Sequence, residues 1–309
     1  MQKILITGAS GFIGINLVNS LDVQFFNVSP FSRKNGFDYN LIDCNYLNDE
    51  GITSIVHLAG KAHDLKNISN VQDYFNVNTD LTIRIFNAFL KSNATKFIFF
   101  SSVKSVKDHL DGILTEETIP TPTTPYGKSK LAAENYILSK SGVLNKQIFI
   151  LRPSMIHGPG NKGNLNLLYN IVKKGVPWPL GAFENKRSFC SIENLCFVIQ
   201  ELIDNENIPS GLYNIADDEP LSTNELIKLI ARSQGKKSNI LHLPKNLITI
   251  ISKLGDLIKL PLNTERLHKL TEFYVVSNSK IQQAIGKSLP VSSREGLIKT
   301  LKSFNKKAK

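Results

Sequence analysis

The chain has 309 residues, of which 41% are hydrophobic, and it carries a formal net charge of +11. This length suits two associated domains, and the composition is ordinary for a globular protein. Because no run of about 18 apolar residues occurs, we expect no membrane insertion. The first residues also lack the layout of a signal peptide. The three cysteines form no Cys-x-x-Cys pair, which favours a reducing, cytoplasmic environment and no metal site.

The positive charge comes mainly from lysine, with thirty Lys against seven Arg. The lysines are spread along the chain, and no zinc-finger, homeodomain or RNA-recognition signature accompanies them. Diffuse lysine is typical of a solvated surface, so we expect no nucleic-acid partner. A positive field can instead help to attract an anionic substrate.

A glycine-rich turn follows the first expected strand, residues 3–7, and opens a helical-looking segment. Glycines at such a turn let backbone approach a pyrophosphate, and the first N–H groups of the new helix attract phosphate. The spacing is Gly-x-x-Gly-x-x-Gly. It predicts a dinucleotide site made of Gly8, Ser10, Gly11, Phe12, Ile13 and Gly14.

The second expected strand, 23–28, lacks an acid at its end. An acid there favours NAD, whereas a basic residue can hold the 2′-phosphate of NADP. Arg33 and Lys34 follow instead, and they either contact that phosphate or form an exposed basic turn. The cofactor is therefore NAD or NADP, with a slight preference for NADP. A third strand is expected at 41–43, with Asp43 at its end near the adenine.

The fourth expected strand, 54–60, ends in small residues that let a cofactor approach, and Leu58, Ala59 and Gly60 are therefore cofactor candidates. His57 lies inside the apolar strand, where a core histidine is favoured over an acid–base group. His63, in the loop beyond, can approach the active site.

The motif at 126–130 puts Tyr126 and Lys130 four residues apart, just after Pro125. A proline at the entry to an apolar-periodic run predicts a helix start, and residues four apart share one helix face. An ammonium beside a phenol lowers the tyrosine pKa. Such a tyrosine can exchange a proton with a sugar hydroxyl or a ketone. Taken alone, the pair also fits an ordinary surface helix.

Strand and helix alternate up to about residue 153, which predicts an α/β protein with a Rossmann-type doubly wound parallel sheet. We expect an NAD(P)-binding domain at 1–153, with returning segments at about 186–217. A smaller, mainly substrate-binding α/β domain is expected at 154–309. The apolar segment 247–260 is expected to be a helix that either packs on this domain or covers the site.

These segments together resemble the extended short-chain dehydrogenase/reductase family, and within it the UDP-hexose 4-epimerases and UDP-4-keto-sugar reductases. The resemblance spans nearly the whole chain. It is carried by 7–14, 57–59, Asn78, 101–102, 126–130, 151–153, 157–160, 187–189 and 279–281.

The resemblance implies that Tyr126 is the general acid–base, that Lys130 holds the nicotinamide ribose, and that Ser102 hydrogen-bonds the reacting sugar oxygen. It also implies that Asn78 belongs to the cofactor site and that Arg187 meets the substrate diphosphate. Asn164 and Arg266 are further substrate-binding candidates by position. A homodimer is common in this family.

Dehydratases of the family carry an Asp-Glu pair directly after the serine, whereas this chain has Val103 and Lys104. The acid and the base that a dehydratase needs are therefore missing at these two positions. What remains is a UDP-sugar 4-epimerase or a 4-keto reductase, in the synthesis of surface-polysaccharide precursors. The basic turn favours the reductase and the overall likeness favours the epimerase. The alternative is a catalytically silent NADP-binding sensor or scaffold, although members of that kind usually lose the tyrosine or the lysine.

Overall fold

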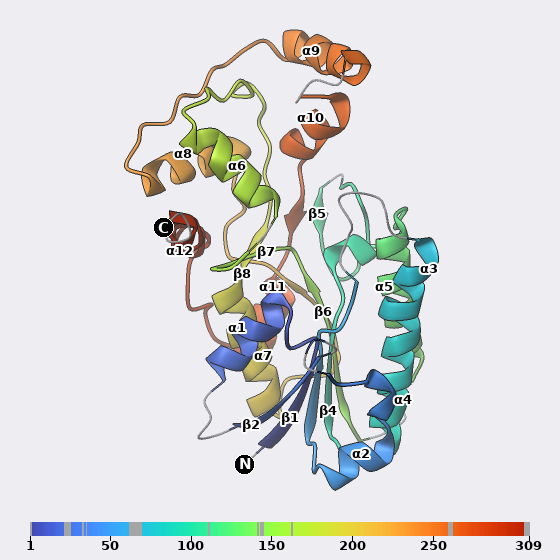
Figure 1. Cartoon of the computed structure of the whole chain (residues 1–309). Coiled ribbons are helices and arrows are strands. Elements are labelled where there is room, and N and C mark those ends of the chain that lie inside the picture. Colours follow the sequence, from blue (N-terminus) through green and yellow to red (C-terminus); the bar gives the residue numbers. More distant parts are fainter. Residues whose placement is uncertain are drawn as a thin grey trace.

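The computed structural model describes residues 2–21, 26–32, 34, 36–61, 70–110, 112–140, 142, 145–161, 163–258 and 262–305. Its centre is a parallel sheet with the strand order β2-β1-β3-β4-β6-β9 (Figure 1). The sheet strands are β1 (Gln2–Thr7), β2 (Phe26–Phe31), β3 (Ser54–His57), β4 (Lys96–Phe100), β6 (Gln147–Pro153) and β9 (Gly211–Ile215). The prediction of a Rossmann-type parallel sheet is confirmed.

Helices cover both faces of this sheet, because parallel neighbours need crossover connections that return over a face. One layer holds α1 (Phe12–Ser20), α7 (Ile192–Asp204) and α11 (Ser279–Ile285). The other holds α2 (Cys44–Asp49), α3 (Val71–Phe75), η3 (Asn76–Asp80), α4 (Leu81–Lys91) and α5 (Pro125–Lys140). Figure 1 shows α1 and α7 on one side of the sheet and α3, α4 and α5 on the other. All of β4 is buried, as expected for a strand covered on both faces.

The remaining elements pack around a separate apolar cluster beyond the carboxyl edge of the sheet. They comprise β7 (Met155–His157), β8 (Phe189–Ser191), α6 (Asn164–Lys173), α8 (Thr223–Ser233), α9 (Lys245–Ile258), α10 (Thr264–Thr271) and α12 (Ser293–Asn305). Short elements η4 (Val103–Ser105), β5 (Ile113–Leu114) and β10 (Val275–Val276) lie between this part and the sheet. A capping box at Ser222 and Glu225 starts α8.

The predicted third strand at 41–43 is wrong. The chain there forms η2 (Tyr39–Leu41), and Asp43 then caps α2 by accepting a hydrogen bond from the backbone N–H of Tyr46 at 2.8 Å. Asp38 caps η2 in the same way. Aspartates that bond to nearby backbone N–H groups favour helix starts over strands, and this preference outweighs the apolar pair between them.

Among the described residues, no helix is long and apolar enough to cross a membrane.

Candidate active site

The glycine turn after β1 has two kinds of glycine. Gly8 has a φ of +71°, and a Cβ on it would lie 2.7 Å from the backbone N of Ala59. A Cβ on Gly14 would lie 2.5 Å from the carbonyl O of Gly8. These two glycines are required by the packing of the chain itself. Gly11 differs, because a Cβ there would meet only one atom, the Gly8 oxygen at 3.2 Å. The turn is thus open at Gly11, at the N-terminus of α1, as a phosphate-binding turn must be.

Hydroxyl groups and an amine lie where β2 ends. The Oγ atoms of Ser10 and Ser32 are 2.5 Å apart, so the glycine turn touches the end of β2. The backbone N–H of Lys34 donates to the Ser32 Oγ at 3.2 Å, and the Lys34 side chain is exposed. Arg33 lies outside the described residues. Among the described residues, these contacts offer hydrogen-bond donors, which suit an anionic group.

His57 is a core residue, as interpreted from the sequence. Its Nδ1 lies 2.7 Å from the Thr7 Oγ1, and its Nε2 lies 3.0 Å from the Thr82 Oγ1. Burial, aided by the charge of Lys130, lowers the pKa of His57 to about 3, so the ring is neutral. It therefore ties β3 to β1 and α4. His63 lies outside the described residues.

Asn78 fixes the loop after β3 to the helix of the Tyr-Lys motif. Its Oδ1 accepts from the backbone N–H of Lys61 at 2.8 Å, and its Nδ2 donates to the Ser129 Oγ at 3.0 Å. Asn78 lies in the π-helical segment η3, a local widening that is frequent at functional sites. A Cβ on Gly60 would lie 3.1 Å from the Asn78 Oδ1 and 3.2 Å from the Lys130 Nζ. Asn78, Gly60 and Lys130 therefore meet at one point.

Gly127 lets α5 approach the segment that carries Ser102. A Cβ on Gly127 would lie 2.3 Å from the carbonyl O of Lys104, so no larger residue fits there. The approach brings the Tyr126 phenol into a hydrogen bond with Ser102. Burial raises the pKa of Tyr126, and the bond to Ser102 partly opposes this rise.

The expectation that Lys130 lowers the pKa of Tyr126 is therefore wrong, because burial raises this pKa. The Lys130 Nζ donates to the carbonyl O of Phe100 at 2.6 Å. Burial lowers the pKa of Lys130 to about 8, although Glu134 acts in the opposite direction. The helical spacing correctly predicted that Tyr126 and Lys130 share one helix face. It could not predict how deeply they are buried, and burial dominates both pKa values.

Sequence reasoning missed a buried ion pair directly behind these residues. The carboxylate of Glu134 accepts two hydrogen bonds from Arg152, at 2.5 Å from Nη2 and at 3.0 Å from Nε. The hydroxyls of Ser101 and Ser105 donate to the same carboxylate. Glu134 is 0% exposed and Arg152 is 3% exposed. The signal was present, because Glu134 follows Lys130 by four residues on the same helix face.

Arg187 lies between the sheet and the outer helices. Its guanidinium donates to the carbonyl O of Lys269 at 2.8 Å and to the Glu272 Oε2 at 3.3 Å. Burial lowers the pKa of Arg187, and Glu272 opposes this. Its backbone bridges to Tyr274, whose hydroxyl lies 2.7 Å from the carbonyl O of Lys107. Arg187 is thereby connected to the segment that follows Ser102.

The other two predicted substrate residues lie on the outer helices. Arg266 is an exposed residue of α10, the helix whose Lys269 carbonyl holds Arg187, and Asn164 is the first residue of α6. A cavity of about 60 Å³ lies beside Arg187. It is lined by Met155, Leu165, Leu168, Arg187, Phe189, Leu221, Thr223, Leu226 and Leu270.

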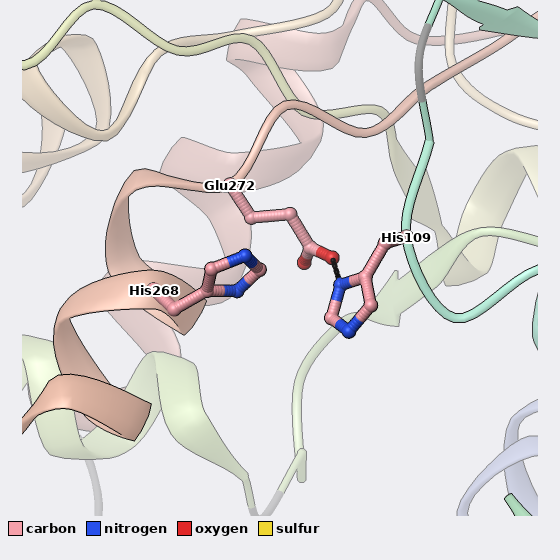
Figure 2. A group of neighbouring side chains, drawn as sticks. All are labelled: His109, His268 and Glu272. Atoms are coloured by element: carbon pink, nitrogen blue, oxygen red, sulfur yellow. Dashed lines mark hydrogen bonds and ion pairs between the residues drawn. The ribbon is translucent and has the colours of Figure 1, made fainter. Parts of the chain in front are cut away.

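Figure 2 shows a polar cluster where the segment after Ser102 meets α10. The His109 Nδ1 lies 2.9 Å from the Glu272 Oε1, and the rings of His109 and His268 have centroids 4.8 Å apart. Two imidazoles and a carboxylate are zinc ligand types. However, Glu272 also pairs with Arg187, and the Lys104 Nζ lies 4.0 Å from it. These cations oppose a metal ion. We therefore interpret the cluster as an ion-pair contact between the two parts of the molecule.

Residues 4–216 match the model of the NAD dependent epimerase/dehydratase family. The chain belongs to this family. The match confirms the predicted family and the prediction of an enzyme that depends on a nicotinamide cofactor.

Three similar proteins match this chain over nearly the whole length of both partners. A UDP-glucose 4-epimerase from Vibrio cholerae is 29% identical over 98% of this chain and 95% of its own. The N-acetyl-α-D-glucosaminyl-diphospho-ditrans,octacis-undecaprenol 4-epimerase of Escherichia coli O157:H7 is 26% identical over 97% and 94%. The structure of UDP-N-acetylglucosamine 4-epimerase from Bacillus cereus superposes with a TM-score of 0.79 at 22% identity, over 99% of this chain and 100% of that one.

Proposed function

We propose that this family member acts at carbon 4 of a UDP-linked hexose, and that it is foremost a 4-epimerase of a UDP-N-acetylhexosamine or UDP-glucose. The observation that carries the proposal is the convergence of three side chains at the carboxyl edge of the sheet. Tyr126 hydrogen-bonds Ser102, and Lys130, one turn further along α5, reaches the end of β4 beside Gly60. The same edge carries the glycine turn that suits a dinucleotide pyrophosphate.

In this proposal each residue has a distinct task. Tyr126 accepts the proton of the sugar 4-hydroxyl during oxidation and returns a proton during reduction. Ser102 holds the same oxygen, and the Lys130 ammonium holds the cofactor ribose. When bound, the nicotinamide accepts and returns a hydride. The glycine turn and Lys130 would hold the cofactor, and the positive charge of its oxidised form would oppose the rise in the Tyr126 pKa that burial causes.

The substrate nucleotide is placed by the outer helices in this proposal. Arg187 offers a planar, charged donor that suits a diphosphate. In this proposal Arg187, which pairs with Glu272, contacts the diphosphate. Arg266 of α10 and Asn164 of α6 are proposed to contact the substrate as well. We further propose a cytoplasmic homodimer that supplies surface-polysaccharide precursors, and sedimentation equilibrium of the purified chain would reveal a monomer if the dimer is wrong.

The second candidate is a 4-keto-sugar reductase, which the acid-free end of β2 favours through its fit to NADP. Incubation with UDP-N-acetylglucosamine separates the two. We expect UDP-N-acetylgalactosamine to form without net use of cofactor. Stoichiometric NADPH oxidation on a UDP-4-keto-6-deoxy-N-acetylhexosamine would establish the reductase. Cofactor binding without turnover on either substrate would favour the silent sensor or scaffold.

Lys34→Ala tests the cofactor phosphate. If Lys34 meets the 2′-phosphate beside Ser10 and Ser32, the variant weakens NADP binding by about 10- to 100-fold, the usual value of a hydrogen bond to a charged group. NAD affinity stays unchanged, as does NADP affinity in the control Lys302→Ala on α12. Calorimetric titration measures both constants. Equal NADP affinity in Lys34→Ala and the natural chain would make 32–34 a solvated basic turn.

A further inference from the structure

Helix α9 carries an apolar stripe on its outer side. Five large aliphatic side chains of this helix are exposed by 45–79%, namely Leu247, Ile250, Leu254, Leu257 and Ile258. Their spacing of three and four places them on one helical face. Scattered exposed apolar residues are ordinary on a protein surface, but a continuous stripe indicates an interaction site.

The other side of α9 is firmly packed. Ile248, Ser252 and Gly255 are buried, and a Cβ on Gly255 would lie 2.0 Å from the carbonyl O of Leu262. The helix is therefore held against the segment that leads into α10. Of the two expected roles of this helix, the contacts agree with packing on the outer part of the molecule and not with a lid over the site. Figure 1 shows α9 at the far end of the molecule from the sheet, where it can meet a large flat partner.

The segment around α9 is strongly basic. Residues 236–269 hold seven Lys and Arg residues against two acids, and so contribute five of the eleven net positive charges of the chain. Both acids have partners, since Asp256 bonds to Thr264 and Glu265 pairs with Lys269. On α9 itself Lys253 is exposed beside the stripe, whereas Lys245 is exposed on the other side of the helix, near the ring of Phe183. Positive charge beside an apolar stripe complements a surface that is anionic and has an apolar interior.

We propose that α9 docks the protein on an anionic lipid surface. A 14-residue helix is about 21 Å long, and with an apolar stripe and basic flanks it can lie in the interface plane with the stripe among the acyl chains. Lys253 then meets the anionic headgroups. A second copy of the chain would bring the same positive charge to the contact, which disfavours the stripe as a dimer interface.

The test is sedimentation of the full chain with vesicles. We expect binding to phosphatidylglycerol vesicles, little binding to phosphatidylcholine vesicles, and weaker binding as salt rises. Leu254→Glu/Leu257→Glu should lower the partition coefficient by at least about tenfold. Lys253→Gln should lower it and reduce its salt dependence, without touching the apolar stripe.

The matched control is Leu41→Glu/Val71→Glu, which makes the same chemical change at side chains that are 60% and 53% exposed elsewhere. It should bind vesicles like the natural chain. The proposal is overturned if the natural chain does not bind phosphatidylglycerol vesicles. It is also overturned if the control loses as much vesicle binding as Leu254→Glu/Leu257→Glu. Concentration-dependent self-association that disappears in Leu254→Glu/Leu257→Glu, with no vesicle binding, would assign the stripe to a second copy instead.

Discussion

Replacing Tyr126 by Phe is expected to lower kcat by about 10²- to 10⁴-fold, the usual contribution of a positioned acid–base group. The ring remains, so the packing of α5 against the segment after Ser102 remains too. Only the hydroxyl that bonds to Ser102 is lost. Because that hydroxyl is proposed to move the proton and not to hold the cofactor, the cofactor dissociation constant should change by no more than a few-fold.

Tyr136→Phe is the matched control on the same helix. Its hydroxyl donates to the Asn87 Oδ1 at 2.8 Å, away from the proposed site, so the variant loses a comparable hydrogen bond and should keep its turnover. Steady-state kinetics and calorimetric titration of cofactor give the two readouts. If Tyr126→Phe keeps more than about a tenth of the natural kcat, the proposed acid–base role of Tyr126 is wrong.

The sheet and the position of the Tyr-Lys motif could be predicted because each rests on a local pattern. The apolar run 96–100 and the glycine turn after residue 7 have few alternative structures. The prediction of a third strand failed because Asp38 and Asp43 hydrogen-bond to nearby backbone N–H groups. This local effect outweighs the weak apolar signal between them.

The electrostatics of the site could not be predicted from spacing. The pKa of Tyr126 depends on how deeply the phenol is buried, and burial depends on the glycine contact between α5 and Lys104 across the fold. The partner of Glu134 is Arg152 on β6, a contact that only the folded chain brings together. Helical spacing alone would nevertheless have placed Glu134 beside Lys130.

Glu134→Ala is expected to destabilise the protein by about 3–5 kcal/mol, because it leaves the buried Arg152 guanidinium without its counter-charge. The hydroxyls of Ser101 and Ser105 also lose their acceptor. Urea unfolding measures the loss. Glu265→Ala is the control, since it removes the exposed ion pair with Lys269 and should cost about 0.3–0.5 kcal/mol.

The double variant Glu134→Leu/Arg152→Met separates stability from positioning. Replacing both members of a buried ion pair by apolar residues of similar size is often neutral or stabilising, so this variant should recover most of the lost free energy of unfolding. Its kcat should nevertheless be lower than that of the natural chain, because Ser101 adjoins Ser102 and the lost carboxylate no longer favours the ammonium form of Lys130. Recovery of both stability and kcat would make the pair purely structural. A Glu134→Ala variant no less stable than Glu265→Ala would contradict the buried ion pair itself.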